Sequence, residues 1–145
     1  MTTWVVLLRA INVGGTGKLA MADLVALCER AGFSGARTYI QSGNVVFASR
    51  ATEVKVKAAL ERALAAKLGK PVGVLVRRAA ELKRVLADNP FPEAPPNRVI
   101  VMFFDAAPPA AAIAAITPPS GERLVLHGRE LYIHLGDILG TIMMM

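Results

Sequence analysis

The order of short apolar runs and helical stretches in the first 77 residues limits the fold more than any other feature of this sequence. The run at 4–8 is apolar and rich in β-forming residues, and three glycines in four positions, 14–17, break regular structure soon after it. Apolar residues then recur at helical spacing over 21–31, and Gly32 follows where a C-cap is expected. The sequence therefore predicts a strand, a loop and a helix in this order.

Two further β-rich runs, 36–40 and 44–48, are separated by Gln41, Ser42 and Gly43. A three-residue loop that carries glycine is typical of a hairpin, in which glycine adopts the positive φ that such a loop often needs. We therefore expect a hairpin here, with a positive φ at Gly43.

A second helix is predicted to begin near Thr52, because apolar residues then repeat every four positions from Val56 to Leu68. Gly69 and a following proline end it, and the run 72–76 has the composition of a strand. The order over residues 1–77 is thus β-α-β-β-α-β, which is that of a ferredoxin-like α+β subdomain.

The remaining sequence predicts a second subdomain of the same kind that is incomplete. A helix at 79–88 leads into a segment with four prolines in seven residues, so we assign 78–97 to a helix and a proline-rich linker. Residues 98–145 then give a strand, a short alanine-rich helix and a hairpin that turns at Gly128 and Arg129. This order, β-α-β-β, lacks the last helix and strand of the unit.

The positive charge of the protein is concentrated in the first subdomain. Residues 1–77 carry 11 Lys and Arg against 4 Asp and Glu, a net charge of +7, whereas residues 78–145 carry 6 against 7. A basic surface attracts nucleic acids and small anions. The alternative is that the lysines and arginines of the second helix only keep one of its faces in water.

The candidate ligand site is the glycine-rich loop after the first strand, where backbone N–H groups and a helix N-terminus can meet an anion. The loop matches neither the P-loop nor the dinucleotide-binding pattern, and a purely structural turn is the competing interpretation. In a fold of this order, the polar tip of the first hairpin and this loop usually lie toward opposite ends of adjacent strands. The topology therefore does not by itself predict a pocket that contains both. The ligand-binding candidates are Arg9, Asn12, Gly14, Gly15 and Lys18 in the loop, with Gln41, Ser42 and Asn44 at the hairpin tip.

The sequence identifies no other chemistry. An RNA-recognition module has the same order of elements, but it stacks bases on exposed aromatic residues of its first and third strands, where this chain offers Trp4 and Phe47 alone. The two histidines lack a third metal ligand nearby, and Cys28 lies on the apolar stripe of its helix. We therefore expect no metal, no cofactor and no recognisable catalytic group, so that enzymatic activity is left undecided.

Two long motifs are similar to those of an uncharacterised bacterial family, domain of unknown function 1697. The string from Leu7 to Gly15, LLRAINVGG, resembles the family's opening LLRGINVGG, and the family carries the same YIQSGNVVF hairpin that this chain has at residues 39–47. The resemblance implies two ferredoxin-like subdomains and no activity. Family members continue after the final hairpin through a segment similar to GxGRSKL, a helix and a strand. Residues 136–145 stand there instead, so the resemblance also predicts a truncated second subdomain.

Three functions remain open at this stage. The first is a cytoplasmic protein that binds a small, phosphate-bearing anion, since the run at 4–8 does not resemble a signal peptide and no stretch reaches the 18 or so apolar residues that span a membrane. The second is a nucleic-acid-binding module that uses the basic subdomain. The third is an interaction protein whose incomplete second sheet pairs with another copy of the chain.

Overall fold

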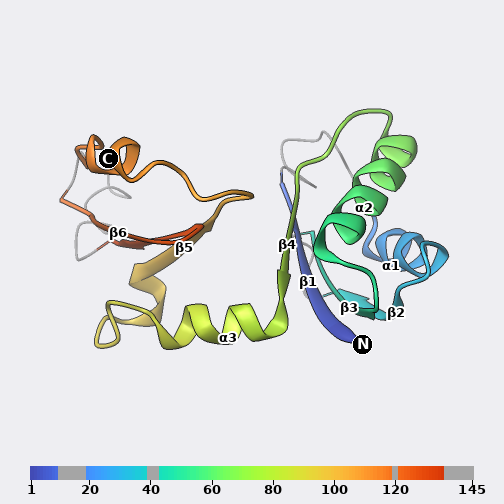
Figure 1. Ribbon diagram of the computed structural model, residues 1–145, viewed down its shortest axis with the longest axis horizontal. Helices are drawn as coiled ribbons and strands as arrows, with labels where there is room; N and C mark the ends of the chain where they lie inside the picture. The colour runs from blue at the N-terminus through green and yellow to red at the C-terminus, as the bar shows by residue number, and fades with distance from the viewer. Residues whose placement is uncertain (10–18, 39–42, 119–120, 136–145) are drawn as a thin grey trace. The chain divides into compact units, whose positions relative to one another are not determined.

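The computed structural model describes residues 1–9, 19–38, 43–118 and 121–135, and divides the chain into two compact units, Met1–Lys83 and Arg84–Met145. Unit 1 contains a four-stranded antiparallel sheet in the order β2-β3-β1-β4, with two helices on one face (Figure 1). This is the ferredoxin-like arrangement predicted from the sequence. Its elements are β1 (Thr2–Leu8), α1 (Met21–Arg30), β2 (Ser34–Thr38), β3 (Asn44–Ser49), α2 (Glu53–Leu68) and β4 (Val74–Arg78).

Unit 2 contains a three-stranded antiparallel sheet in the order β5-β7-β6. The chain therefore has the predicted α+β fold, in which the second sheet repeats the first three strands of the ferredoxin-like order. The expectation that residues 136–145 replace the closing elements concerns residues outside the described ones. From the end of unit 1 onward the elements are α3 (Ala79–Ala87), a 3₁₀ turn (Pro96–Arg98), β5 (Val99–Phe103), α4 (Ala110–Ala114), β6 (Arg123–His127) and β7 (Glu130–His134).

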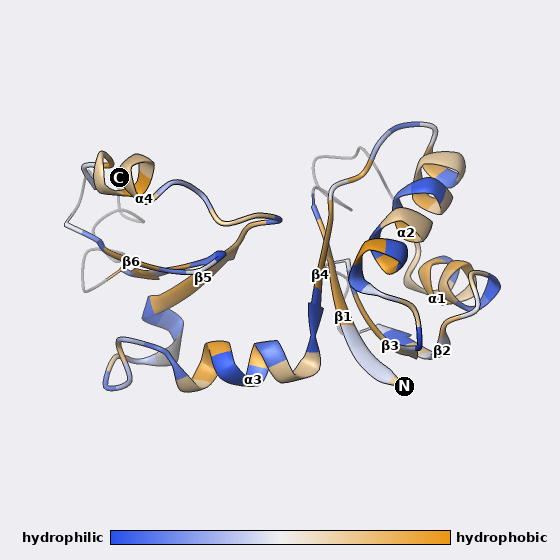
Figure 2. Ribbon diagram, viewed as in Figure 1, coloured by the Kyte–Doolittle hydropathy of each residue, from blue (hydrophilic) through white to orange (hydrophobic). Residues whose placement is uncertain are grey.

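The core of unit 1 lies between the sheet and its two helices. Alternate residues of the strands point into it, because side chains of a strand project to opposite faces in turn. The rings of Phe33 and Phe47 stack inside it, with centroids 4.3 Å apart. Figure 2 shows that α2 carries both hydrophilic and hydrophobic residues, and its buried residues, Val56, Leu60 and Leu64, recur every four positions. The most deeply buried core residues include Val6, Leu24, Cys28, Val45, Val56, Leu60 and Leu64.

The ends of α2 follow the predicted capping chemistry. The side-chain oxygen of Thr52 accepts a hydrogen bond from the backbone N–H of Lys55 at 3.3 Å, and Gly69 adopts a left-handed conformation with φ 74°. The strand boundaries differ from the prediction by one or two residues: β1 and β2 each begin two residues earlier, β2 ends two residues earlier, β3 ends one residue later, and β4 begins and ends two residues later. β4 extends to Arg78, two residues beyond the apolar run, because Trp4 and Val5 of β1 pair with Arg78 and Arg77. The ladder with β1, rather than apolar character, therefore sets the end of this strand.

The core of unit 2 is smaller and centres on Tyr132. Val85 of α3 and Phe91 pack with this residue, and the Tyr132 hydroxyl donates a 2.6 Å hydrogen bond to the carbonyl of Val85. On the other face of the sheet, α4 and β6 enclose a hollow of about 400 Å³ that Ile113, Leu124 and other residues line. The five-residue α4 thus covers only part of its side of the sheet.

Candidate functional site

The end of β1 lies between the beginnings of two other strands. The N–H of Leu8 donates to the carbonyl of Gly43 at 2.9 Å, on one side, and the N–H of Arg9 donates to the carbonyl of Gly73 at 2.9 Å, on the other. Both neighbours run antiparallel to β1, so they start where β1 ends. The chain therefore enters the glycine-rich loop at the end of the inner strand β1, directly beside the segments that contain Gly43 and Gly73.

Gly73 gives the Arg9 side chain room to lie over the backbone. A Cβ atom placed on Gly73 would lie 3.0 Å from Cβ, 3.5 Å from Cδ and 3.6 Å from Nε of Arg9. The first of these distances is too short for relaxed carbon atoms, so a larger residue would displace the arginine. Arg9 itself is exposed. A glycine inside a strand-like pattern signals such a close approach, but the sequence interpretation did not use this signal.

Gly43 lies on the other side of the end of β1. It is buried and has a φ of 83°, which confirms the predicted positive φ and explains why glycine stands there. Asn44 follows at the start of β3, half-buried and opposite Leu7 of β1. The hairpin that contains the polar tip therefore ends against the end of β1.

The expectation that the hairpin tip and the loop after β1 belong to opposite ends of adjacent strands was wrong for the flanking residues. Because β1 and β3 are antiparallel, the last residues of one lie beside the first residues of the other, as the Leu8 to Gly43 hydrogen bond shows. Of the predicted ligand residues, the structure describes Arg9 and Asn44. The other six, Asn12, Gly14, Gly15, Lys18, Gln41 and Ser42, lie outside the described residues.

The two aromatic residues of the central strands cannot serve as a base-stacking platform. Trp4 and Phe47 pair directly across β1 and β3, and their side chains point to the face that the helices cover. They are 4% and 2% exposed. An RNA-recognition module needs such residues on the open face, so this comparison excludes that mode of binding for the described part of the sheet.

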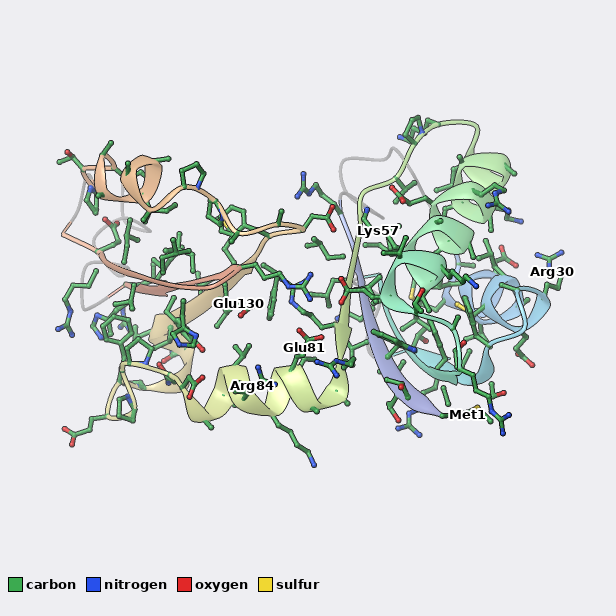
Figure 3. All side chains as sticks on the ribbon, in the orientation of Figure 1. Met1, Arg30, Lys57, Glu81, Arg84 and Glu130 are labelled. Carbon is green, nitrogen blue, oxygen red and sulfur yellow. The ribbon has the colours of Figure 1, made fainter. Side chains whose placement is uncertain are left out.

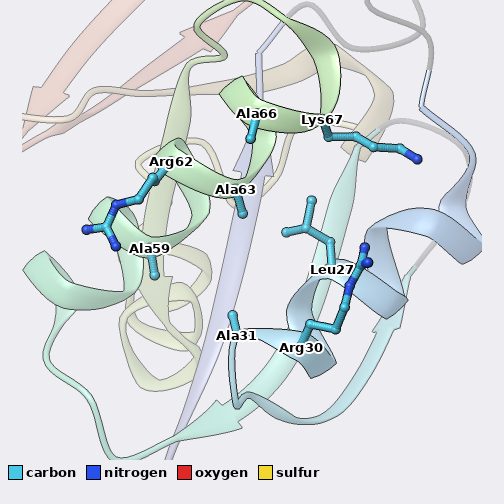
Figure 4. A pocket seen from close by; sticks show the side chains of 8 residues that line it. All are labelled: Leu27, Arg30, Ala31, Ala59, Arg62, Ala63, Ala66 and Lys67. Carbon is cyan, nitrogen blue, oxygen red and sulfur yellow. The ribbon is translucent and has the colours of Figure 1, made fainter.

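A shallow groove of about 660 Å³ lies between α1 and α2 (Figure 4). Small and apolar residues form its floor, while Arg30, Arg62 and Lys67 stand around it. Figure 3 shows Arg30 at the outer surface of α1. Lys67 also lies 3.8 Å from the carboxylate of Asp23. The sequence interpretation missed this groove, although the alanines at 59, 63 and 66 at helical spacing could have indicated a place where two helices leave a hollow.

The cysteine and the two histidines lie outside this groove. Burial is the main cause that raises the pKa of the Cys28 thiol to about 12, and the neighbouring Glu29 carboxylate adds to it, so this cysteine is a core residue as predicted. The imidazole of His127 lies 3.9 Å from the carboxylate of Asp88, and that of His134 packs against the Phe91 ring. Among the described residues, no three His, Cys, Asp or Glu side chains are grouped as metal ligands.

Within the same part of the chain, no helix combines the length and apolar character needed to cross a membrane. Residues 1–132 match the sequence profile of a family described as "Protein of unknown function (DUF1697)". The structure is similar to that of the conserved bacterial protein SP0830 from Streptococcus pneumoniae, with a TM-score of 0.81 and 20% sequence identity over 98% of this chain and 81% of that one. No curated protein matches the sequence. At this identity the similarity establishes a shared fold.

Proposed function

Because the chain belongs to the DUF1697 family of proteins of unknown function, we propose a function from its own residues. The protein binds a small, phosphate-bearing anion in the cytoplasm, at the end of the unit 1 sheet where β1 finishes. The proposed site comprises Arg9 and the loop that follows it, together with Asn44 and the hairpin tip that precedes it. The hydrogen bond from Leu8 to Gly43 is the observation that supports the proposal, because the residues just before the loop and just after the hairpin tip lie side by side there.

The chemistry of this edge suits an anion. Arg9 is exposed and offers a planar guanidinium group that can donate two parallel hydrogen bonds to phosphate oxygens. Its backbone is fixed by the hydrogen bond to Gly73, and its side chain lies over a residue without a Cβ atom. Lys18 would add a second positive charge from the other end of the loop. Glycines without side chains allow backbone N–H groups to approach the ligand closely.

The positive charge on α2 supports a nucleic-acid function less well. Lys57 lies 3.2 Å from Glu61, and Lys67 contacts Asp23, so part of that charge is already balanced by neighbouring carboxylates. A small anion at the edge of the sheet needs only the cations that lie there. Binding to a nucleic acid needs many phosphate contacts, and its affinity falls steeply with salt.

Calorimetric titration with inorganic phosphate, sulfate and ATP tests the proposal on four single variants of the whole chain. Arg9→Gln and Lys18→Ala should each weaken binding by about tenfold, the effect of losing roughly 1.4 kcal/mol of charged hydrogen bonding. Arg50→Gln is the matched control, because this exposed arginine follows the opposite end of β3. Gly73→Ala should also weaken binding without changing the charge.

Three outcomes would overturn the proposal. One is the absence of binding heat with all three anions. Another is an equal loss of affinity in Arg50→Gln and Arg9→Gln, which would show that only the overall charge matters. The third is tight binding of a DNA or RNA oligonucleotide, with a steep salt dependence, in a protein that ignores the small anions; this would favour the nucleic-acid alternative.

A further inference from the structure

The sheet of unit 1 has its two helices on one face (Figure 1), and a pair of leucines lies on the other face near the end of β1. Leu7 of β1 and Leu75 of β4 stand directly opposite each other, and both are half-buried. Their neighbours in the chain, among them Leu8 and Val74, enter the core under the helices. Because side chains along a strand alternate between the two faces, Leu7 and Leu75 project away from the helices and lie close together there.

The side chain of Arg9 projects to the same face as this leucine pair. Its Cβ atom lies 3.0 Å from the place that a Cβ atom on Gly73 would take, so it shares the face of position 73. Gly73 precedes the buried Val74 and therefore faces the same way as Leu75. One step of two residues along β1, about 7 Å, separates Arg9 from Leu7. The exposed arginine thus lies beside an apolar surface.

A polar residue adjoins the leucine pair on its other side. Asn44, at the start of β3, stands directly opposite Leu7 and is half-buried. The two described residues of the proposed anion site, Arg9 and Asn44, therefore both lie next to the leucine pair. Small-molecule sites commonly have this composition, in which apolar surface holds most of the ligand and a few polar groups fix its orientation. Inorganic phosphate would contact the polar groups alone, whereas an organic group attached to the phosphate would also reach the leucines.

We propose that the ligand of this site is a phosphate monoester whose organic group is apolar or aromatic where it joins the phosphate. Arg9 binds the phosphate, and the organic group lies on Leu7 and Leu75. This inference rests on the proposed function, because the leucine pair selects among ligands that an anion-binding group already holds. An ester with a hydroxyl-rich organic group is disfavoured, because its hydroxyls would leave water for a surface that offers them no hydrogen bonds.

Calorimetric titration of the whole chain with two esters of equal charge, phenyl phosphate and glycerol 3-phosphate, tests the ligand class. The wild type should bind phenyl phosphate about tenfold more tightly, the effect of removing about 55 Å² of ring surface from water. Leu7→Ala and Leu75→Ala should each lower this ratio about threefold, since each leucine supplies about half of the contact. Val5→Ala is the matched control, because Val5 is half-buried on the same face of β1 but about 14 Å from Arg9, beyond the reach of one ring.

The fluorescence of Trp4, the single tryptophan, checks that each variant is folded before it is titrated. Arg9→Gln should weaken both esters by the same factor and leave their ratio unchanged, because it removes a contact to the phosphate alone. Equal affinity for the two esters in the wild type would overturn the ligand class and leave anion binding intact. A ratio that Val5→Ala lowers as much as Leu75→Ala would also overturn it. A protein that binds neither ester nor inorganic phosphate would overturn the proposed function together with this inference.

Discussion

The two units begin with the same order of elements, but their first strands have different surroundings. In unit 1, β1 is an inner strand, and its residues Trp4 and Val6 are 4% and 0% exposed. In unit 2, β5 is one of the two outer strands of the sheet that the described residues form, and Ile100 and Met102 are nearly half exposed. Both strands are strongly apolar. The comparison shows that an apolar strand is buried by what pairs with it and covers it, and not by its own composition.

The helices that pack on the two sheets also differ in how much they bury. α2 has 16 residues and three buried side chains, and it begins at a side-chain cap. α4 has five residues, no side-chain cap and no buried residue. A short, uncapped helix contributes little stability by itself, because most helical stability in proteins comes from packing an apolar face. Unit 1 should therefore be the more stable of the two, and the substitutions below test this difference.

The largest effect is expected from Leu60→Ala in α2. Leu60 is fully buried, so removing its side chain leaves a cavity and should lower the free energy of unfolding by about 3 kcal/mol, within the range for buried leucines. Met102→Ala in β5 should cost less than about 1 kcal/mol in dilute protein, since this side chain is already half exposed.

Urea denaturation can follow the units separately. Trp4 is the single tryptophan, so its fluorescence reports on unit 1, whereas far-UV circular dichroism reports on both units. Leu60→Ala should shift the fluorescence transition to lower urea concentration, and Met102→Ala should leave that transition in place. Equal shifts in the two variants would contradict the difference in packing between the units.

The second effect is a loss of stability of unit 1 at alkaline pH. Burial raises the pKa of Cys28 from 9.0 to about 12, so the folded protein holds the thiol proton at pH values where the unfolded chain has released it. The stabilising contribution is fully present below pH 9 and is lost as the pH rises toward 12. Fluorescence-detected unfolding should show this decline, and Cys28→Ala should make it shallower. A slope that this substitution leaves unchanged would contradict the assignment.

The sequence was sufficient to predict the order of elements because each is bounded by local signals, such as the threonine and glycine at the ends of α2. It could not show that Ile100 and Met102 are exposed, because an apolar run looks the same whether or not a partner lies at its edge. The extension of β4 to Arg78 was missed for the same reason: its pairing with Trp4 is a long-range contact.

For the candidate site, local patterns were sufficient to select Arg9 and Asn44, but not to show that both lie where β1 ends. That arrangement depends on the antiparallel pairing of β1 with β3 and β4, whose residues are far apart in the sequence. Gly73 was missed although a glycine within a strand-like run signals a close approach. The sequence could not show that the approaching side chain is that of Arg9, because this contact is long-range.

A smaller effect than that of Leu60→Ala is expected in unit 2, from Tyr132→Phe. The Tyr132 hydroxyl donates to the carbonyl of Val85 near the C-terminal end of α3, where carbonyl groups lack helical partners. Removing the hydroxyl leaves this buried carbonyl unsatisfied and should cost about 1 kcal/mol. Burial is also the main cause that raises the pKa of Tyr132, and Asp88 and Glu130 contribute.

This raised pKa gives a separate measurement on the same residue. The folded protein keeps the phenol proton above pH 10, where the unfolded chain loses it, so the stability of unit 2 should decline as the pH rises beyond 10. Circular dichroism should detect that decline in the wild type and a weaker one in Tyr132→Phe, with the tryptophan signal unchanged between the two proteins. If Tyr132→Phe shifted the Trp4 transition as well, the two units would unfold as one, and the contrast between them would apply to packing but not to stability.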